Sequence, residues 1–221
     1  MKLLVEALAK FTCGLLLVGL LIFLPAGTLH YPYGWLLIGL LFGPMLIAGF
    51  VMLYKSPDFL KKRLDAKEKQ GTQKSVVAFA GLMFIAGFVV AGLDYRFGWS
   101  DMPTWVTITA SILFLTAYAL YAEVMRENAY LSRTIQVREN QKVIDTGLYG
   151  IVRHPMYSAT LVLFLSMPLV LGSVYALAVF LVYPLLIAKR IRHEEEFLAR
   201  ELPGYRDYQQ KVKYRLIPFV W

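Results

Sequence analysis

Five stretches of this chain contain no aspartate, glutamate, lysine or arginine, and they constrain the fold more than any other feature. They cover residues 11–29, 34–54, 76–93, 104–122 and 157–188. A helix needs about 20 mostly apolar residues to cross a bilayer core about 30 Å thick, and the first four stretches have that length. Because they are continuously apolar, without the alternation of a barrel strand, they predict transmembrane helices.

The basic residues predict the orientation of these helices. If the chain starts in the cytoplasm and crosses at each of the first four stretches, Arg96 is the one basic residue placed outside by those crossings. An excess of lysine and arginine on the inner side is typical of membrane proteins. The net charge of +8 therefore indicates membrane orientation, and we expect no nucleic-acid partner.

The fifth stretch predicts a hairpin rather than a single crossing. Its 32 residues would form a helix about 48 Å long, too long for an ordinary span. A single crossing would also place the basic tail outside. Pro168 and the pair Gly172-Ser173 offer a break, so we predict arms at 157–171 and 174–188 that enter from the cytoplasm and return to it.

The predicted fold class is therefore an all-α integral membrane protein with both termini in the cytoplasm. It has four transmembrane helices, a C-terminal membrane hairpin and a cytoplasmic cap; the four helices cover 11–29, 34–54, 76–93 and 104–124. Residues 1–125 form the transmembrane region, and residues 126–221 form a separate catalytic region. The Gly39 and Gly43 pair has the GxxxG spacing, which indicates close helix packing.

Two segments that flank the hairpin carry the residues suited to chemistry. They are residues 133–157 and 189–221, and the hairpin brings them to the same membrane face. Each also has a structural interpretation. Glu194 to Glu196 suit a solvated helix face with an Arg190–Glu194 pair, and Arg153 to Pro155 suit an interfacial anchor that begins a helix. The tail tyrosines equally suit an interfacial aromatic belt.

Several common site types are not predicted. His154 and His193 are separated by the hairpin, the chain has no HxxxH or HExxH spacing, and its one cysteine is Cys13, so we expect no metal site. GxGxxG, Walker A and GxSxG motifs are also absent from the sequence.

Together the two segments have the pattern GxY-x₃-RHPxY, apolar hairpin, EE-x₂-L, Y-x₂-Y and RLIP. The residues are Gly147, Tyr149, Arg153, His154, Pro155, Tyr157, Glu194, Glu195, Leu198, Tyr205, Tyr208 and Arg215 to Pro218. This pattern resembles the isoprenylcysteine carboxyl methyltransferase family over residues 130–221, and the related phospholipid N-methyltransferases share much of it.

The resemblance implies a methyltransferase that uses S-adenosylmethionine and acts on a lipid-like or prenylated acceptor. It implies that the cofactor is lined by Gln136, Gln141, Ile144, Tyr149, His154, Pro155, Met156, Tyr157 and Glu194. Arg190 matches the position that contacts the substrate carboxylate in that family, so the implied catalytic residues are Arg190, His154 and Glu194. The family commonly has a His-x-Leu-Val segment, and this chain has Gln141 at the position of its histidine. Any contact specific to that histidine is therefore missing here.

The acceptor chemistry leaves alternatives open. A carboxylate is already ionised near neutral pH, so Arg190 would only position it, which favours O-methylation of an isoprenylcysteine-type acceptor. A phospholipid amine would need a base such as His154 or a glutamate. Sterol reductases of the wider fold group have similar Arg-His-Pro/Asn-Tyr stretches, so an NADPH-dependent lipid reductase is a further alternative, although the Glu194-Glu195 pair opposes a polyanionic cofactor. A non-enzymatic membrane scaffold or transport component is the remaining alternative.

Overall fold

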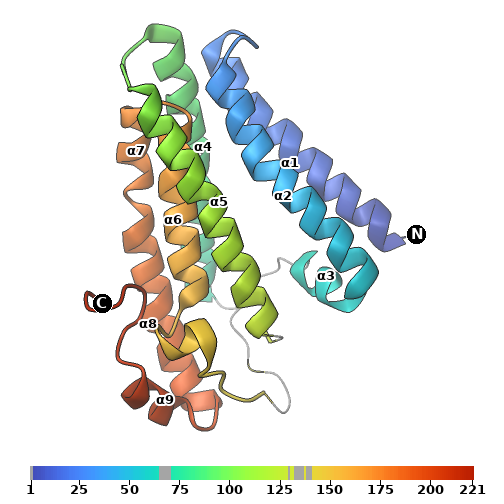
Figure 1. The fold of residues 1–221 in the computed structure, drawn as a ribbon, viewed down its shortest axis with the longest axis vertical. Coiled ribbons are helices and arrows are strands. Elements are labelled where there is room, and N and C mark those ends of the chain that lie inside the picture. Colours follow the sequence, from blue (N-terminus) through green and yellow to red (C-terminus); the bar gives the residue numbers. More distant parts are fainter. Residues whose placement is uncertain (1, 65–70, 129, 132–136, 138–140) are drawn as a thin grey trace.

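The structure, a computed structural model, describes residues 2–64, 71–128, 130–131, 137 and 141–221. Every regular element among these residues is a helix (Figure 1). In chain order they are α1 (Lys2–Ala26), α2 (Pro32–Lys55), α3 (Pro57–Leu64), α4 (Gly71–Phe97), α5 (Thr104–Glu127), the 3-10 helix η1 (Gly147–Gly150), α6 (Pro155–Val170), α7 (Val174–Phe180), α8 (Tyr183–Glu201) and α9 (Tyr205–Lys211).

Five helical segments are long and apolar enough to cross a membrane, so the predicted multi-pass membrane fold is confirmed. They are α1, α2, α4, α5 and the α7–α8 arm, while α6 is apolar but shorter. The predicted helices 34–54, 76–93 and 104–124 lie inside α2, α4 and α5, whereas the predicted helix 11–29 extends past the end of α1, which stops at Ala26 before Gly27 with φ of 67°. The observed helices are longer because charged residues at their ends continue the helix. Lys10 of α1, for example, pairs with Glu6 one turn earlier at 2.6 Å.

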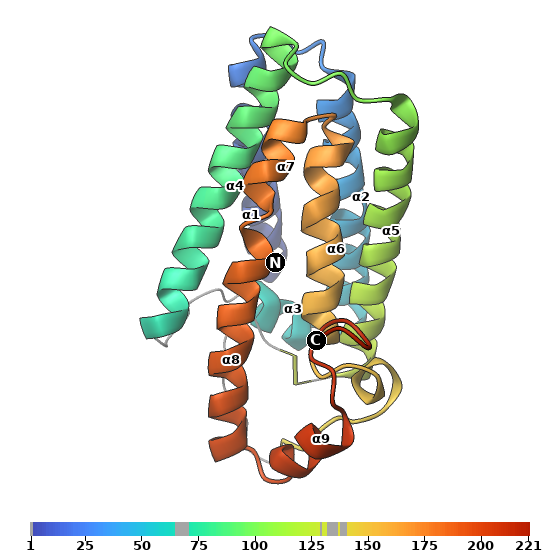
Figure 2. The ribbon, with the colours of Figure 1, turned by 90° about the vertical axis from the view of Figure 1, so that its left-hand side faces the viewer.

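The connections separate into two groups at opposite ends of the bundle. The turns that join α1 to α2, α4 to α5 and α6 to α7 lie at one end, and α3, η1 and α9 lie at the other (Figures 1 and 2). The bundle thus gathers the basic segments at the end that carries α9, as the charge pattern predicts. That this end faces the cytoplasm stays a prediction.

The hairpin of α6 and α7–α8 turns where it was predicted to turn. Gly172 has φ of 71°, a left-handed conformation suited to glycine, and the Ser173 hydroxyl caps α7 by accepting from the Ala176 N–H at 3.0 Å. The second arm differs from the prediction. It is interrupted between α7 and α8, because Pro184 lacks an N–H and its ring conflicts with a continuous helix. It then continues to Glu201, well beyond residue 188.

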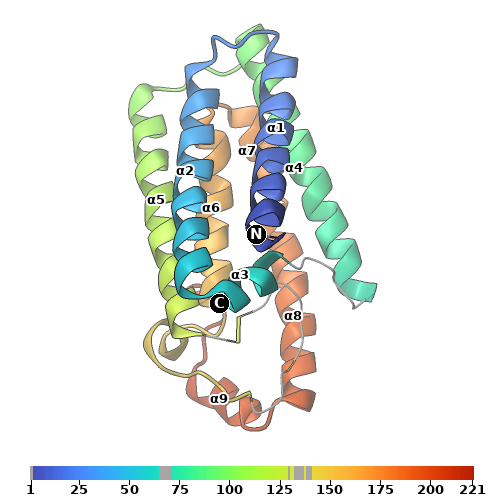
Figure 3. The ribbon, with the colours of Figure 1, turned by 90° about the vertical axis from the view of Figure 1, so that its right-hand side faces the viewer.

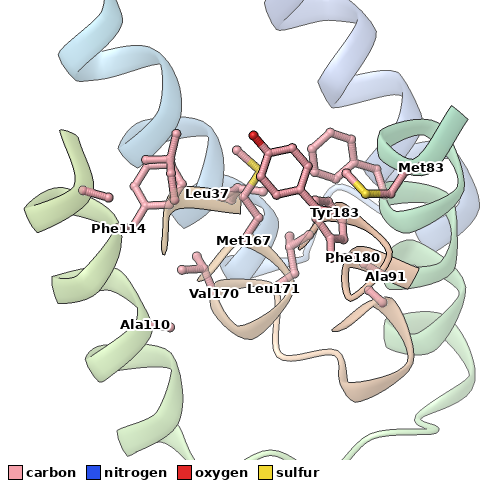
Figure 4. Close-up of a cluster of buried hydrophobic side chains, with 14 of the residues drawn as sticks. Leu37, Met83, Ala91, Ala110, Phe114, Met167, Val170, Leu171, Phe180 and Tyr183 are labelled. Atoms are coloured by element: carbon pink, nitrogen blue, oxygen red, sulfur yellow. The ribbon is translucent and has the colours of Figure 1, made fainter. Parts of the chain in front are cut away.

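The hairpin packs into the centre of the bundle. Phe114 of α5, Met167 of α6, Met83 of α4 and Phe180 of α7 belong to one buried cluster (Figure 4). A Cβ added at Gly87 of α4 would lie 2.3 Å from the Phe180 ring, so this glycine allows α7 to approach α4. The helices α5, α4 and α2 all contact the hairpin (Figure 3), while Leu181 and Leu185 of its second arm are exposed.

The glycine pair expected to mark close packing does not mark it. A Cβ at Gly39 or Gly43 would meet no described atom within 4 Å, so that interpretation is wrong within this chain. Close backbone packing occurs instead at Gly92 of α4, where a Cβ would lie 2.4 Å from the carbonyl oxygen of Ile22. The spacing of small residues alone did not identify the contact.

A buried carboxylate fixes the hairpin turn at the end away from α9. Asp94 is 2% exposed and accepts hydrogen bonds from the Ser100 backbone N–H at 2.7 Å and the Ser100 hydroxyl at 2.6 Å. The Ser173 hydroxyl also donates to Asp94. Nearby, the Tyr31 hydroxyl donates to the carbonyl of Leu171 at 2.6 Å. These bonds join the hairpin turn to α4 and to the start of α2.

Candidate functional site

A pocket lies at the open end of the hairpin, between η1, α6, α8 and α9. Its empty volume, including open solvent at the mouth, is about 790 Å³. The lining residues are Asn128, Tyr130, Leu131, Gln141, Lys142, Val143, Ile144, Tyr149, Arg153, His154, Met156, Tyr157, Glu194, Leu198, Leu202, Tyr205 and Tyr208.

The 3-10 helix η1 fits against the end of α5 through a glycine. Gly147 has φ of 51°, and a Cβ there would lie 1.4 Å from a carboxylate oxygen of Glu127. That carboxylate accepts the Leu148 N–H at 3.0 Å. Any other residue at position 147 would be strained and would displace this bond. The glycine of the GxY pattern therefore sets where η1 places Tyr149.

Two hydrogen bonds hold Tyr149, one at its hydroxyl and one at its backbone carbonyl. Its hydroxyl accepts from the Asn128 side chain at 3.0 Å, and its carbonyl accepts from the Tyr208 hydroxyl at 2.7 Å. Burial raises the pKa of Tyr149 to about 12, the Asn128 hydrogen bond acts in the opposite direction, and the charge of Glu194 adds to the increase. Tyr149 is therefore a neutral hydroxyl in the pocket wall.

A buried carboxylate on α8 connects the elements around the pocket. Glu195 is 5% exposed and lies 2.7 Å from Arg153 Nε, 3.2 Å from His154 Nε2 and 2.8 Å from Arg215 Nε. The interpretation of the whole carboxylate run as a solvated face is therefore wrong for Glu195, although Glu196 is exposed. The segment Arg153 to Pro155, called the RHP segment below, and the C-terminal tail both contact this carboxylate.

The tail is also bonded to the RHP segment through the backbone. The Arg153 N–H donates to the carbonyl of Tyr214 and the His154 N–H to that of Arg215, both at 2.9 Å. Nη1 of Arg153 donates to the carbonyl of Val212 at 2.6 Å. The wall of the pocket near His154 therefore depends on a segment about sixty residues later in the chain.

A second hydrogen-bonded chain runs from α8 to α6 and back. Arg190 Nε donates to the Tyr157 hydroxyl at 2.8 Å, and that hydroxyl donates to Glu194 Oε2 at 2.5 Å. The sequence predicted a direct ion pair between Arg190 and Glu194. In the structure the Tyr157 hydroxyl lies between the two side chains and bonds to both. Arg190 is 9% exposed, and its guanidinium lies 6.0 Å from the centre of the Tyr157 ring.

Most of the residues expected to bind the cofactor lie together in the pocket wall. They are Gln141, Ile144, Tyr149, His154, Met156, Tyr157 and Glu194. Pro155 is buried and begins α6, and it does not belong to the pocket lining. Arg190 lies behind Tyr157 rather than in the lining, and Gln136 lies outside the described residues.

Other lining residues were not assigned to the site from the sequence. Leu198 and Leu202 follow Glu194 at four-residue spacing and so lie on the same face, which the helical period would have indicated. Asn128 carries no motif that identifies it. Tyr205 and Tyr208 are buried in the cap, so the aromatic-belt interpretation is wrong for them.

The described residues were also compared with the side-chain groups that bind metal ions. No group of three or more histidine, cysteine, aspartate or glutamate side chains there could hold a metal ion. His154 instead contacts Glu195, and two arginines occupy the remaining positions around that carboxylate.

Part of this chain is similar to known proteins. Residues 105–203 match the family model described as phospholipid methyltransferase, a range that begins in α5, includes the hairpin and ends just after α8. The chain is 31% identical over 91 residues to the Delta(14)-sterol reductase TM7SF2 of Mus musculus, covering 40% of this chain and 22% of that protein. It is 32% identical over 134 residues to the cobalt-zinc-cadmium resistance protein CzcN of Cupriavidus metallidurans, covering 58% of each.

These relatives are matched over only part of their length, about a fifth of the first and under two thirds of the second. The matched family model is that of the phospholipid methyltransferases. The narrower resemblance to isoprenylcysteine carboxyl methyltransferases stays a prediction from the motif.

Proposed function

We propose that this chain is an integral membrane methyltransferase that uses S-adenosylmethionine and modifies an amphiphilic, lipid-like acceptor. The observation that carries the proposal is the pocket at the open end of a membrane hairpin, which lies largely within the segment similar to phospholipid methyltransferases. A polar cofactor can reach this position from the aqueous side. A lipid tail can remain among the helices.

The chemistry of the pocket fits this cofactor. Glu194 offers a carboxylate to hydroxyl or ammonium groups, and Val143, Leu198 and Leu202 offer apolar surface to a flat base. The buried hydroxyl of Tyr205 has no hydrogen-bond partner among the described residues and needs one from a ligand. When bound, the cofactor supplies an electrophilic methyl group.

The protein's own contribution is alignment and exclusion of water. Arg190, Glu194 and Leu198 lie on one face of α8, with about 6 Å along the axis between successive members. One rigid helix therefore relates the position of an acceptor headgroup at its membrane end to that of a cofactor further along. Methyl transfer depends on such alignment more than on acid–base chemistry.

We propose a carboxylate of the isoprenylcysteine type as the acceptor. Arg190 is buried and bonded to Tyr157, so it is a fixed cation beside the pocket that would position an anionic group. A phospholipid amine is the alternative acceptor. It requires a base, and His154 already directs Nε2 toward Glu195, so that role would fall to Nδ1.

A second candidate is an NADPH-dependent lipid reductase, which the partial identity to the Delta(14)-sterol reductase favours. Its cofactor carries several phosphate charges. The carboxylate of Glu194 in the pocket wall opposes such a ligand, whereas it suits the ammonium and ribose of S-adenosylmethionine.

Calorimetric titration of the detergent-purified protein with S-adenosylmethionine and, in parallel, NADPH tests the proposal. We expect saturable binding of the first alone. Glu194→Gln should weaken that binding roughly tenfold or more, because a hydrogen bond to a charged group is lost. Glu196→Gln is the matched control, since Glu196 is exposed on the same helix. Binding of NADPH alone would replace the proposal by the reductase.

Transfer of a labelled methyl group then identifies the acceptor. A farnesylcysteine analogue with a free carboxylate should be labelled, and phosphatidylethanolamine should not. Labelling of phosphatidylethanolamine alone would keep the methyltransferase and overturn the carboxylate acceptor. Arg190→Lys should reduce labelling of the carboxylate, because lysine cannot reproduce the bonded geometry of arginine.

A further inference from the structure

One buried polar group in the pocket has no role in the contacts described so far. The hydroxyl of Tyr205 forms no hydrogen bond with any described residue, and the side chain is 4% exposed and lines the pocket. An unsatisfied buried hydroxyl is unfavourable, so native proteins retain few of them without a reason. A bound ligand that accepts this hydrogen bond would remove the cost.

Apolar side chains pack around the ring of Tyr205. Tyr205 and Leu202 form a buried cluster of the cap, and Val143 and Leu198 pack against it. These four residues also line the pocket. We call this apolar part of the pocket the slot, and the Tyr205 hydroxyl is a hydrogen-bond donor within it.

The charges nearby restrict what the donor meets. Burial raises the pKa of Tyr205, and the negative charges of Glu195 and Glu194 raise it further, against an opposing effect of Arg153. The phenol therefore stays protonated and donates. Because two carboxylates act on the same group, an uncharged acceptor such as a ring nitrogen is favoured over an anion.

We propose that this slot binds a purine base, and that the Tyr205 hydroxyl donates to one of its ring nitrogens. This assignment rests on the proposed function, in which the base is the adenine of the cofactor. Glu194 lies one turn of α8 before Leu198, about 6 Å along the axis, where it faces the ribose of an adenosine seated in the slot. Tyr205 is thus a specificity residue for the base.

Calorimetry with S-adenosylhomocysteine on the full chain in detergent tests the assignment. Tyr205→Phe keeps the ring and removes the hydroxyl, and we expect affinity to fall about tenfold. Three analogues, each with one adenine ring nitrogen (N1, N3 or N7) replaced by CH, should identify the acceptor. One of them should bind wild type about tenfold more weakly than the parent and bind Tyr205→Phe as well as the parent does.

Thermal unfolding without ligand separates binding from structure. Tyr205→Phe should not lower the midpoint, since its hydroxyl bonds to no described residue. Tyr208→Phe should lower it, since that hydroxyl donates to the Tyr149 carbonyl at 2.7 Å. Equal affinity of wild type and Tyr205→Phe, or equal affinity of wild type for all three analogues, would overturn the base assignment alone. Failure of wild type to bind S-adenosylhomocysteine would overturn it together with the proposed function.

Discussion

Two buried carboxylates hold the hairpin, one at each end, and their partners differ. Asp94, at the turn, is surrounded by neutral donors, namely two serine hydroxyls and a backbone N–H. Glu195, at the open end, is surrounded by two arginines and a histidine. Among the described residues, no cation forms an ion pair with Asp94.

The difference corresponds to what each end must do. Closing a turn requires only that two backbone segments be held together, and short neutral hydrogen bonds achieve this. The open end must bring η1, α6, α8 and the tail together around a pocket. A single carboxylate that binds side chains from both the RHP segment and the tail does so, but the buried guanidinium of Arg153 then depends on it.

The largest expected effect is that of Glu195→Ala. The change leaves the Arg153 guanidinium buried without its carboxylate, and we expect a loss of about 3–5 kcal/mol of stability. Unfolding in detergent should show a lowered midpoint, and binding of S-adenosylhomocysteine should be lost. Glu196→Ala is the control and should behave like wild type. A Glu195→Ala protein with wild-type stability and binding would contradict the conclusion that Glu195 holds the open end of the hairpin together.

A smaller effect is expected for Asp94→Ala. The change leaves buried donors unsatisfied, at about 1–3 kcal/mol for such a group. Because Asp94 lies at the far end of the hairpin, the folded fraction should bind S-adenosylhomocysteine with wild-type affinity. The midpoint of unfolding and the calorimetric affinity measure the two properties separately. Weakened binding in the folded variant would mean that the two ends are not independent.

The smallest effect is expected for an exposed ion pair of the cap. Lys211 lies 2.6 Å from Asp145, and its hydrogen bond lowers the pKa of that carboxyl. Any stability from the pair is therefore present at neutral pH and lost as pH falls through the carboxyl range. Lys211→Ala should leave the midpoint nearly unchanged at neutral pH, because exposed pairs contribute little. A large decrease would show that the cap depends on more than the buried network.

The sequence predicted the membrane fold well because charge marks where a helix must leave the apolar phase. It predicted the helix ends less well, since a helix continues into water when its charged residues are solvated or paired. The interruption before α8 had a visible signal in Pro184 that was not used. The packing glycines were misassigned, because spacing shows which residues share a face and not which neighbour meets it.

The functional site was also predicted only in part. The motif identified the segments that meet, and most of the residues it implied line one pocket. It assigned Glu194 to the site but gave Glu195 no role in the ion network, since adjacent positions on a helix differ by about 100° and the motif does not say what the second carboxylate meets. Nor does a sequence reveal that the hydroxyl of Tyr205 lacks a partner, which depends on every neighbouring atom.

The backbone bonds between Arg153 and Tyr214 have a consequence for how the protein is made. Chains are synthesised from the N-terminus, so residues 212–216 leave the ribosome after the hairpin does. Until residues 212–216 arrive, the RHP segment lacks the strand-like partner and the arginine that complete its wall. A nascent chain can thus have an inserted hairpin and still lack the bonds that complete its pocket wall, and ligand binding reports that these residues have joined the RHP segment.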